Sequence, residues 1–181
     1  MLSRQKILSG LRDSAPMLTN AILFQLTWFA CVIGGAVGEP LWGFAGVLAL
    51  FAFSWYVGLI KQDLRVLLAL GLTGFAVDTA WITLGILDFG GDALAPSWIV
   101  ALWLGFGLTV NHSMGWLRQK PVLAAALAAL FAPVTYLAGA RLGAVEVTNT
   151  LGLGLISGTW AIMFLLLFAS GPARPETESV R

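Results

Sequence analysis

Six apolar runs, each long enough to cross a lipid bilayer, occupy most of this 181-residue chain. A membrane-spanning helix needs about 20 consecutive apolar residues, because each residue adds about 1.5 Å and the hydrocarbon layer is about 30 Å thick. Backbone groups inside a bilayer must be satisfied within the segment, and runs without polar alternation exclude a β-barrel. We therefore predict an all-α membrane protein, a six-transmembrane-helix bundle with spans at 17–38, 42–60, 66–87, 97–117, 122–140 and 150–170.

The composition also indicates a membrane protein with a single domain. Hydrophobic residues make up 59% of the chain and charged residues 10%, so a soluble fold would lack polar surface. The net charge is +1 and the basic residues are scattered, which argues against nucleic-acid binding. The expected organisation is a cytoplasmic N-terminal segment (1–16), a transmembrane domain (17–170) and a disordered cytoplasmic tail (171–181). The N-terminal segment fits either a helix lying on the membrane surface or a solvated tail.

The distribution of basic residues predicts the orientation, because lysine and arginine are enriched in the cytoplasmic loops of membrane proteins. In a six-span arrangement only Arg141 falls on the outer side. Both termini are therefore predicted to be cytoplasmic. Three spans followed by three spans also fit a 3+3 inverted repeat, since an odd number of helices reverses the direction of the second half. The nine basic residues on the inner side are Arg4, Lys6, Arg12, Lys61, Arg65, Arg118, Lys120, Arg174 and Arg181.

Asp78 is the most informative polar residue, since it lies within 22 residues (66–87) that contain no other charge. An unpaired carboxylate inside a bilayer is energetically expensive, so Asp78 is expected to face a protein or water-lined interior. Several small residues on its helical face suit close helix packing around a buried polar group. That face comprises Gly71, Gly74, Asp78, Trp81, Ile82 and Gly85.

Other polar residues inside the predicted spans, Gln25, Asn111 and His112, could form a polar band with Asp78, and Asn20 lies deeper toward the cytoplasm. Asp78 and His112 differ in depth by roughly 10 Å if their helices are untilted, and Gln25 lies between them. The alternative is that these side chains only link helices through hydrogen bonds, each contributing about 0.6 to 2 kcal/mol. The predicted polar cavity is bordered by Asn20, Gln25, Asp78, Asn111, His112 and Tyr136.

Established catalytic and metal-binding motifs are absent from the sequence. His112 is the only histidine, which excludes a multi-histidine metal site or a bis-histidine haem, and we predict neither a metal nor a cofactor. Cys31 is the only cysteine, so it cannot form an internal disulfide and is expected to pack as a small apolar residue.

Four groups of residues together resemble a known protein family: NAILFQLTW at 20–28, Asp78, NHS at 111–113 and PVTYLAGARLG at 133–143. The family consists of small bacterial integral inner-membrane proteins known only as a domain of unknown function. The resemblance extends from residue 20 to about 167 and implies a location in the bacterial inner membrane. It implies no established activity, although similar proteins are sometimes encoded near enzymes that modify membrane fatty acids, an association that hints at lipid chemistry.

Three classes of function are compatible with these features. The first is a small transporter or lipid-handling protein with a polar cavity around Asp78 and His112. The second is a membrane-embedded enzyme acting on an acyl chain or other apolar substrate, with His112 as acid or base and Asp78 orienting it. The third is a structural or accessory subunit. Each predicts the bilayer as a partner, the first two add a small-molecule or lipid ligand, and the oligomeric state stays open.

Overall fold

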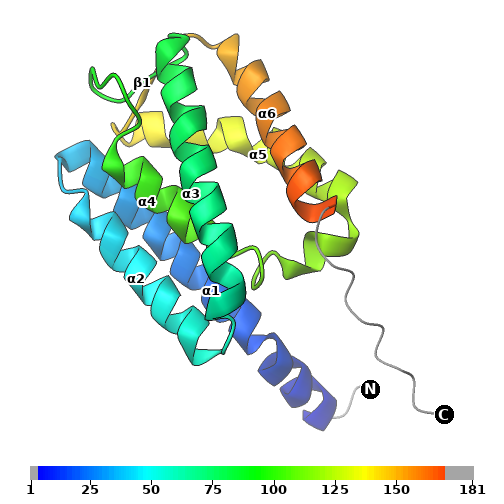
Figure 1. Cartoon of the computed structure of the whole chain (residues 1–181). Coiled ribbons are helices and arrows are strands. Elements are labelled where there is room, and N and C mark those ends of the chain that lie inside the picture. Colours follow the sequence, from blue (N-terminus) through cyan, green and yellow to red (C-terminus); the bar gives the residue numbers. More distant parts are fainter. Residues whose placement is uncertain (1–3, 170–181) are drawn as a thin grey trace.

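The computed structural model describes the backbone of residues 4–169 and the side chains from residue 14 onward. Within that range the chain forms six α-helices, one short 3₁₀ helix and a pair of very short strands (Figure 1). The α-helices are α1 (Arg4–Val37), α2 (Leu41–Tyr56), α3 (Ile60–Thr83), α4 (Ser97–Gly107), α5 (Pro121–Arg141) and α6 (Gly152–Ala169). The 3₁₀ helix is η1 (Gly115–Gln119), and the strands are β1 (Leu87–Asp88) and β2 (Glu146–Val147).

Four of these helices are long and apolar enough to cross a membrane: α1 from Ser14 onward, α3, α5 and α6. Between 22% and 33% of each apolar segment is buried inside the protein, so most of each surface is available to lipid. Surface residues such as Leu72, which is 73% exposed, would be unfavourable in water but are suited to hydrocarbon. The predicted all-helical membrane class is therefore confirmed, while α2 and α4, with 16 and 11 residues, are shorter than the other four.

The fourth predicted span (97–117) is not one continuous helix, because α4 ends at Gly107. Residues 108–114, which we call the connector, form successive turns before η1 begins. At this point the backbone of α4 comes close to α3, since a Cβ on Gly107 would lie 2.6 Å from the Cα of Leu67. The connector therefore places its polar side chains at positions that a straight helix would not give them.

The third predicted span (66–87) also ends early, because α3 stops at Thr83. Gly85 adopts a left-handed conformation with φ of 64°, and the backbone N–H of Ile86 donates back to the carbonyl of Trp81 at 2.9 Å. This is a common helix C-terminus, for which glycine is favoured. Leu87–Asp88 is thereby released to pair antiparallel with Glu146–Val147, joining the α3–α4 loop to the α5–α6 loop.

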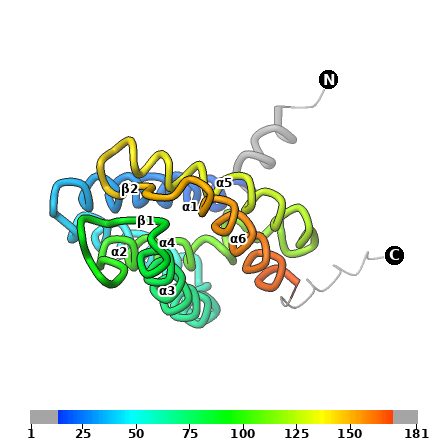
Figure 2. Tube along the Cα trace, turned by 90° about the horizontal axis from the view of Figure 1, so that it is seen from above, coloured from blue at the N-terminus to red at the C-terminus, as the bar shows by residue number. Residues whose placement is uncertain are grey.

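The helices pack unevenly against one another. α1 lies against α2 and α4, α3 lies against α4, and α5 packs mainly on α6. Figure 2 places α1 and α5 along one side of the molecule and α3 along the other. The backbones of α1 and α5 are nevertheless not in extensive contact. The 3+3 repeat is not supported, since the close α1–α2 and α5–α6 pairs have no equals in α4–α5 and α2–α3.

The two predicted terminal segments have different outcomes. Residues 4–16 belong to α1, which continues through Pro16 to Val37, so they extend the first helix instead of forming a separate one. The predicted disordered tail (171–181) lies outside the described residues.

Candidate functional site

Asp78 lies in a closed hydrogen-bonded cluster that joins three helices. Its side chain is fully buried on α3. The indole Nε1 of Trp103 on α4 donates to Oδ2 at 2.6 Å, and the hydroxyl of Tyr136 on α5 donates to Oδ1 at 2.7 Å. Both carboxylate oxygens therefore have a donor, as a buried acid in an apolar environment requires.

The predicted inward face of α3 is confirmed for four of its six residues. Gly71, Gly74, Asp78 and Trp81 are buried. Gly74 has a specific packing role, because a Cβ there would lie 2.0 Å from Cγ of Trp103. The missing side chain gives the Trp103 indole room to reach Asp78. Ile82 is only partly buried, and Gly85 falls in the turn beyond the helix end.

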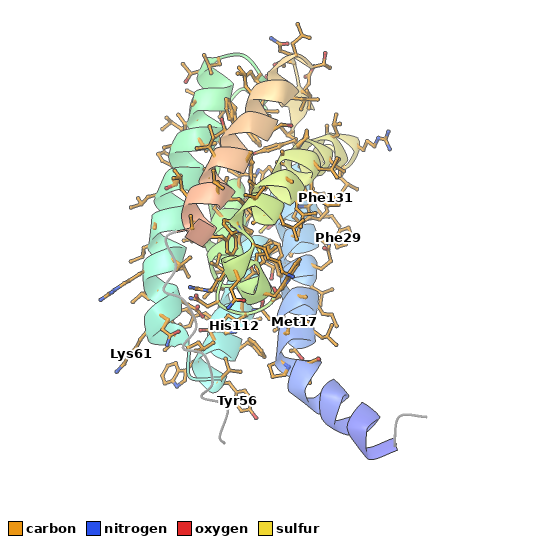
Figure 3. The ribbon with its side chains drawn as sticks, turned by 90° about the vertical axis from the view of Figure 1, so that its right-hand side faces the viewer. Met17, Phe29, Tyr56, Lys61, His112 and Phe131 are labelled. Carbon is orange, nitrogen blue, oxygen red and sulfur yellow. The ribbon has the colours of Figure 1, made fainter. Side chains whose placement is uncertain are left out.

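A second buried carboxylate, Asp63, lies near the first turn of α3 and was not among the predicted site residues. Its side chain is fully buried. Ser54 Oγ on α2 donates to Oδ2 at 2.5 Å, Asn111 Nδ2 in the connector donates to Oδ1 at 2.6 Å, and His112 Nε2 lies 2.6 Å from Oδ2. Arg118 on η1 donates to Asn111 Oδ1, which extends the cluster to the protein surface. Figure 3 shows His112 near the same end of the molecule as Lys61.

The sequence does contain a signal for Asp63. Asp63, Leu67, Leu70, Gly71, Gly74, Asp78 and Trp81 are the buried residues of α3 and form one stripe at helical spacing. Extending the predicted face toward the N-terminus therefore reaches Asp63. The neighbouring Lys61 and Arg65 hid this signal, because a charged KQDLR segment is typical of an exposed turn.

The predicted polar band from Asp78 to His112 does not form in the structure. Asp63 and Asp78 are fifteen residues apart on α3, roughly 22 Å along the helix. His112 binds Asp63, whereas Asp78 binds Trp103 and Tyr136. The suggested orientation of His112 by Asp78 is therefore wrong. The cause is the early end of α4, because the connector carries His112 toward the start of α3.

The Asp63 cluster also differs from a nucleophilic triad. In such a triad the histidine binds the serine hydroxyl and the carboxylate binds the other histidine nitrogen. Here Ser54 and His112 both bind the same oxygen of Asp63, so His112 is not placed to activate Ser54. The arrangement instead ties α2, α3 and the connector together.

Asn20 links α1 to the connector and is fully buried. Its Nδ2 donates to the carbonyl of Leu108 at 3.0 Å, and its Oδ1 accepts from Ser113 Oγ at 2.7 Å and from the Ser113 backbone N–H at 3.2 Å. These bonds satisfy backbone groups where the helix is interrupted. The predicted residues Asn20, Asn111 and His112 thus have hydrogen-bonding roles around the connector.

A cavity of about 490 Å³ lies between α1, α4, α5 and α6. Phe131 contributes to its wall and is 55% exposed, so the cavity reaches the surface of the bundle. A smaller hollow of about 250 Å³ between α1 and α5 shares four lining residues with it, including Gln25 and Thr135. The wall is rich in aromatic side chains: Phe24, Trp28, Phe89, Trp98, Trp103, Phe106, Trp116, Phe131, Tyr136, Trp160 and Phe164.

Of the six predicted cavity residues, only Gln25 and Tyr136 line this cavity. The other four form the hydrogen bonds described above, and Asp78 lies behind the wall, where it holds Tyr136. The aromatic wall is also ordered by ring stacking, since Trp103 and Trp160 have ring centroids 4.6 Å apart and planes inclined by 22°. Of the aromatic residues in this wall, only Tyr136 was among the predicted cavity residues.

Gln25 differs from the hydroxyl-bearing side chains of the cavity, Thr109, Ser113, Thr135 and Tyr136. Thr109 donates to the carbonyl of Phe106, Thr135 to that of Ala132, and the Ser113 and Tyr136 hydroxyls donate within the clusters described above. Among the described residues nothing forms a hydrogen bond with the Gln25 amide. Gln25 is exposed and lines the smaller hollow between α1 and α5, which we call the α1–α5 opening. It lies near the middle of the apolar segment Ser14–Val37.

These features define a multi-pass helical membrane protein with an aromatic cavity that opens sideways between two helices. The chain belongs to the family DUF2878, described as a protein of unknown function, whose model matches residues 17–166. The family suggested by the sequence, one known only as a domain of unknown function, is thereby confirmed. No curated protein and no solved structure matches the chain.

Proposed function

We propose that this protein is a lipid-handling membrane protein that takes an apolar or amphipathic small molecule from the bilayer into the cavity between α1, α4, α5 and α6. The observation that carries the proposal is the cavity itself. Its volume of about 490 Å³ falls within the range of roughly 300 to 1,000 Å³ that is typical of small-molecule sites.

The position and lining of the cavity support entry from the lipid. The α1–α5 opening lies at the level of Gln25, well inside the apolar segment of α1. An apolar molecule could therefore pass between hydrocarbon and cavity without crossing water. The described lining contains no charged side chain, and its aromatic surface would replace the lipid contacts that the molecule gives up.

The buried carboxylates support the same proposal through the walls that they hold. Asp78 positions Trp103 and Tyr136, which both line the cavity. Asp63 holds the connector, whose Thr109, Ser113 and Met114 close the end of the cavity beyond α4. We assign both acids to structural roles, because their oxygens already accept hydrogen bonds from protein donors.

A block of the α1–α5 opening tests the proposal. Thr135 is exposed and lines both hollows, so Thr135→Trp should obstruct the entrance with little effect on folding. Leu130→Trp is a matched control, since Leu130 is 61% exposed on α5 and lies outside both linings. In lipid nanodiscs, labelling of cavity residues by a diazirine-bearing dodecanol probe should fall by about tenfold in Thr135→Trp and stay unchanged in Leu130→Trp, an effect of about 1.4 kcal/mol. Equal labelling of the two variants would contradict lateral entry.

We further propose that all six helical segments cross the membrane, with both termini in the cytoplasm of a bacterium whose inner membrane holds the protein. α4 and the connector run along most of α3, because Trp103 binds Asp78 near one end and Asn111 binds Asp63 near the other. The segment 97–114 thus covers nearly the same depth as a long helix. The Asp63–Asn111–Arg118 chain of contacts also brings two basic turns to one end, as the positive-inside rule requires.

Cysteine labelling in a Cys31→Ala background tests this orientation. Lys120→Cys lies at the basic end and Glu146→Cys in β2 at the other, and both positions are exposed. A membrane-impermeant maleimide added to intact spheroplasts should label Glu146→Cys and should reach Lys120→Cys only after permeabilisation. The reverse pattern would invert the proposed orientation, and labelling of both in intact spheroplasts would exclude an odd number of crossings between them.

A further inference from the structure

We infer that Gln25 recognises the ligand's head group and that this head group is uncharged and able to form hydrogen bonds, such as a hydroxyl or a primary amide. The inference rests on the proposed cavity function and identifies the class of molecule that the cavity accepts. The ligand would have an apolar body among the aromatic side chains and a neutral polar end at the α1–α5 opening.

The first step is the energetic position of the Gln25 amide. It lies eleven residues after Ser14 and twelve before Val37, near the middle of an apolar helix segment. At that depth water is scarce, and a primary amide without a partner loses its hydrogen bonds to water with no replacement. Asn20, five residues earlier on α1, uses both its amide nitrogen and its amide oxygen in hydrogen bonds within the protein, whereas the Gln25 amide forms none among the described residues.

The second step is the location of the amide relative to the cavity. Gln25 lines both the main cavity and the adjoining hollow, which places it where a molecule half inserted between α1 and α5 would keep its polar end. Phe24 and Trp28 flank it on the same helix and line the same two hollows. An amide offers both a donor and an acceptor, so it matches a hydroxyl or another amide in two directions.

The third step excludes a charged head group at this position. The described lining contains no lysine, arginine, histidine or acidic side chain. A phosphate, sulfate or ammonium group drawn to the depth of Gln25 would lose its hydration without gaining an opposite charge, which is strongly unfavourable. A neutral head group loses only its hydrogen bonds to water, and the Gln25 amide can replace these.

A matched set of photoreactive probes, diazirine derivatives of dodecanol, dodecane and dodecyl sulfate, tests the inference in lipid nanodiscs. We expect the dodecanol probe to label the cavity best, and Gln25→Leu to weaken its apparent affinity by about three- to tenfold, the range of one net hydrogen bond. The dodecane probe should be insensitive to Gln25→Leu. Gln62→Leu is the matched control, because Gln62 is an exposed glutamine on α3 that lies outside the cavity lining.

The outcomes separate this inference from the proposed function. If Gln25→Leu leaves dodecanol labelling unchanged, or weakens dodecanol and dodecane equally, head-group recognition is wrong while the cavity function stands. Equal labelling by dodecyl sulfate and dodecanol overturns the neutral class. If Gln25→Leu instead breaks a dimer and leaves dodecanol affinity unchanged, the amide serves subunit contact. If none of the probes labels the cavity and Thr135→Trp changes nothing, the proposed function itself fails.

Discussion

Asp63→Ala is expected to lower the free energy of unfolding by about 3 to 5 kcal/mol, the range observed when one partner of a buried charged cluster is removed. The substitution leaves three groups without their acceptor: the Ser54 hydroxyl, the Asn111 amide and the His112 imidazole. They come from α2 and the connector, so the loss affects the packing of both on α3. Unfolding in mixed micelles, followed by tryptophan fluorescence, measures the change.

Two further variants make this test specific. Asp92→Ala removes an exposed carboxylate and should change stability by no more than about 0.5 kcal/mol. Asp63→Asn keeps the shape of the side chain but offers an N–H₂ group to donors, so its effect should lie between those of the other two variants. If Asp63→Ala behaved like Asp92→Ala, the cluster would not stabilise the fold, and another explanation for its burial would be required.

Gly74→Ala should destabilise the protein by about 3 kcal/mol, the upper part of the range for overpacking a well-packed interior. The added Cβ would lie 2.0, 2.1 and 2.4 Å from three atoms of the Trp103 ring. That ring cannot easily move, because it donates to Asp78 and stacks on Trp160. The same micelle unfolding assay measures the loss, and dodecanol labelling should fall because Trp103 forms part of the cavity wall.

Gly158→Ala is the matched control for this prediction. Gly158 is an exposed glycine in α6, and nothing lies within 4 Å of the position that its Cβ would occupy. The substitution should be neutral or stabilising by up to about 1 kcal/mol, because alanine favours the helix over glycine. Equal destabilisation by Gly74→Ala and Gly158→Ala would show that the contact with Trp103 is not the cause.

The two buried acids together explain how a bundle with so few polar residues keeps one register. Leucine gains little by leaving lipid for another leucine, so apolar contact alone discriminates weakly between neighbouring arrangements of membrane helices. Asp63 and Asp78 each accept from residues on at least two other elements. Sliding α3 along its neighbours would break both sets of bonds at once, which restricts the position of the helix.

The fold could be predicted from the sequence where the prediction depended on the preference of apolar side chains for lipid over water and on helical spacing. Long apolar runs became α1, α3, α5 and α6, and the stripe that contains Gly71, Gly74, Asp78 and Trp81 is buried as its spacing indicated. The prediction failed at the run 97–117. Hydropathy predicts one helix there, yet α4 ends at Gly107, and Asn111, His112 and Ser113 of the connector form hydrogen bonds with residues of α1 and α3.

The candidate site was less predictable, because its partners are distant in sequence. Asp78 bonds to residues 25 and 58 positions away, and His112 bonds to a residue 49 positions away. Depth along a helix predicted that Asp78 and His112 belong to one band, but depth carries no information about which neighbour each side chain faces. Gln25 could be recognised as a polar residue within a span, whereas its lack of a partner became visible only beside the cavity.

By itself the sequence determined the all-helical class, the long apolar helices and most of the inward face of α3, because these follow from hydrocarbon thickness and helical spacing. Only the tertiary structure decided that Asp63 is buried, that His112 binds it, and that α1 and α5 leave an aromatic cavity open to one side. The physical reason is that helix periodicity and hydropathy are local properties. Hydrogen-bond partners and voids depend on which surfaces meet, and close glycine contacts such as those at Gly74 and Gly107 determine how near those surfaces come.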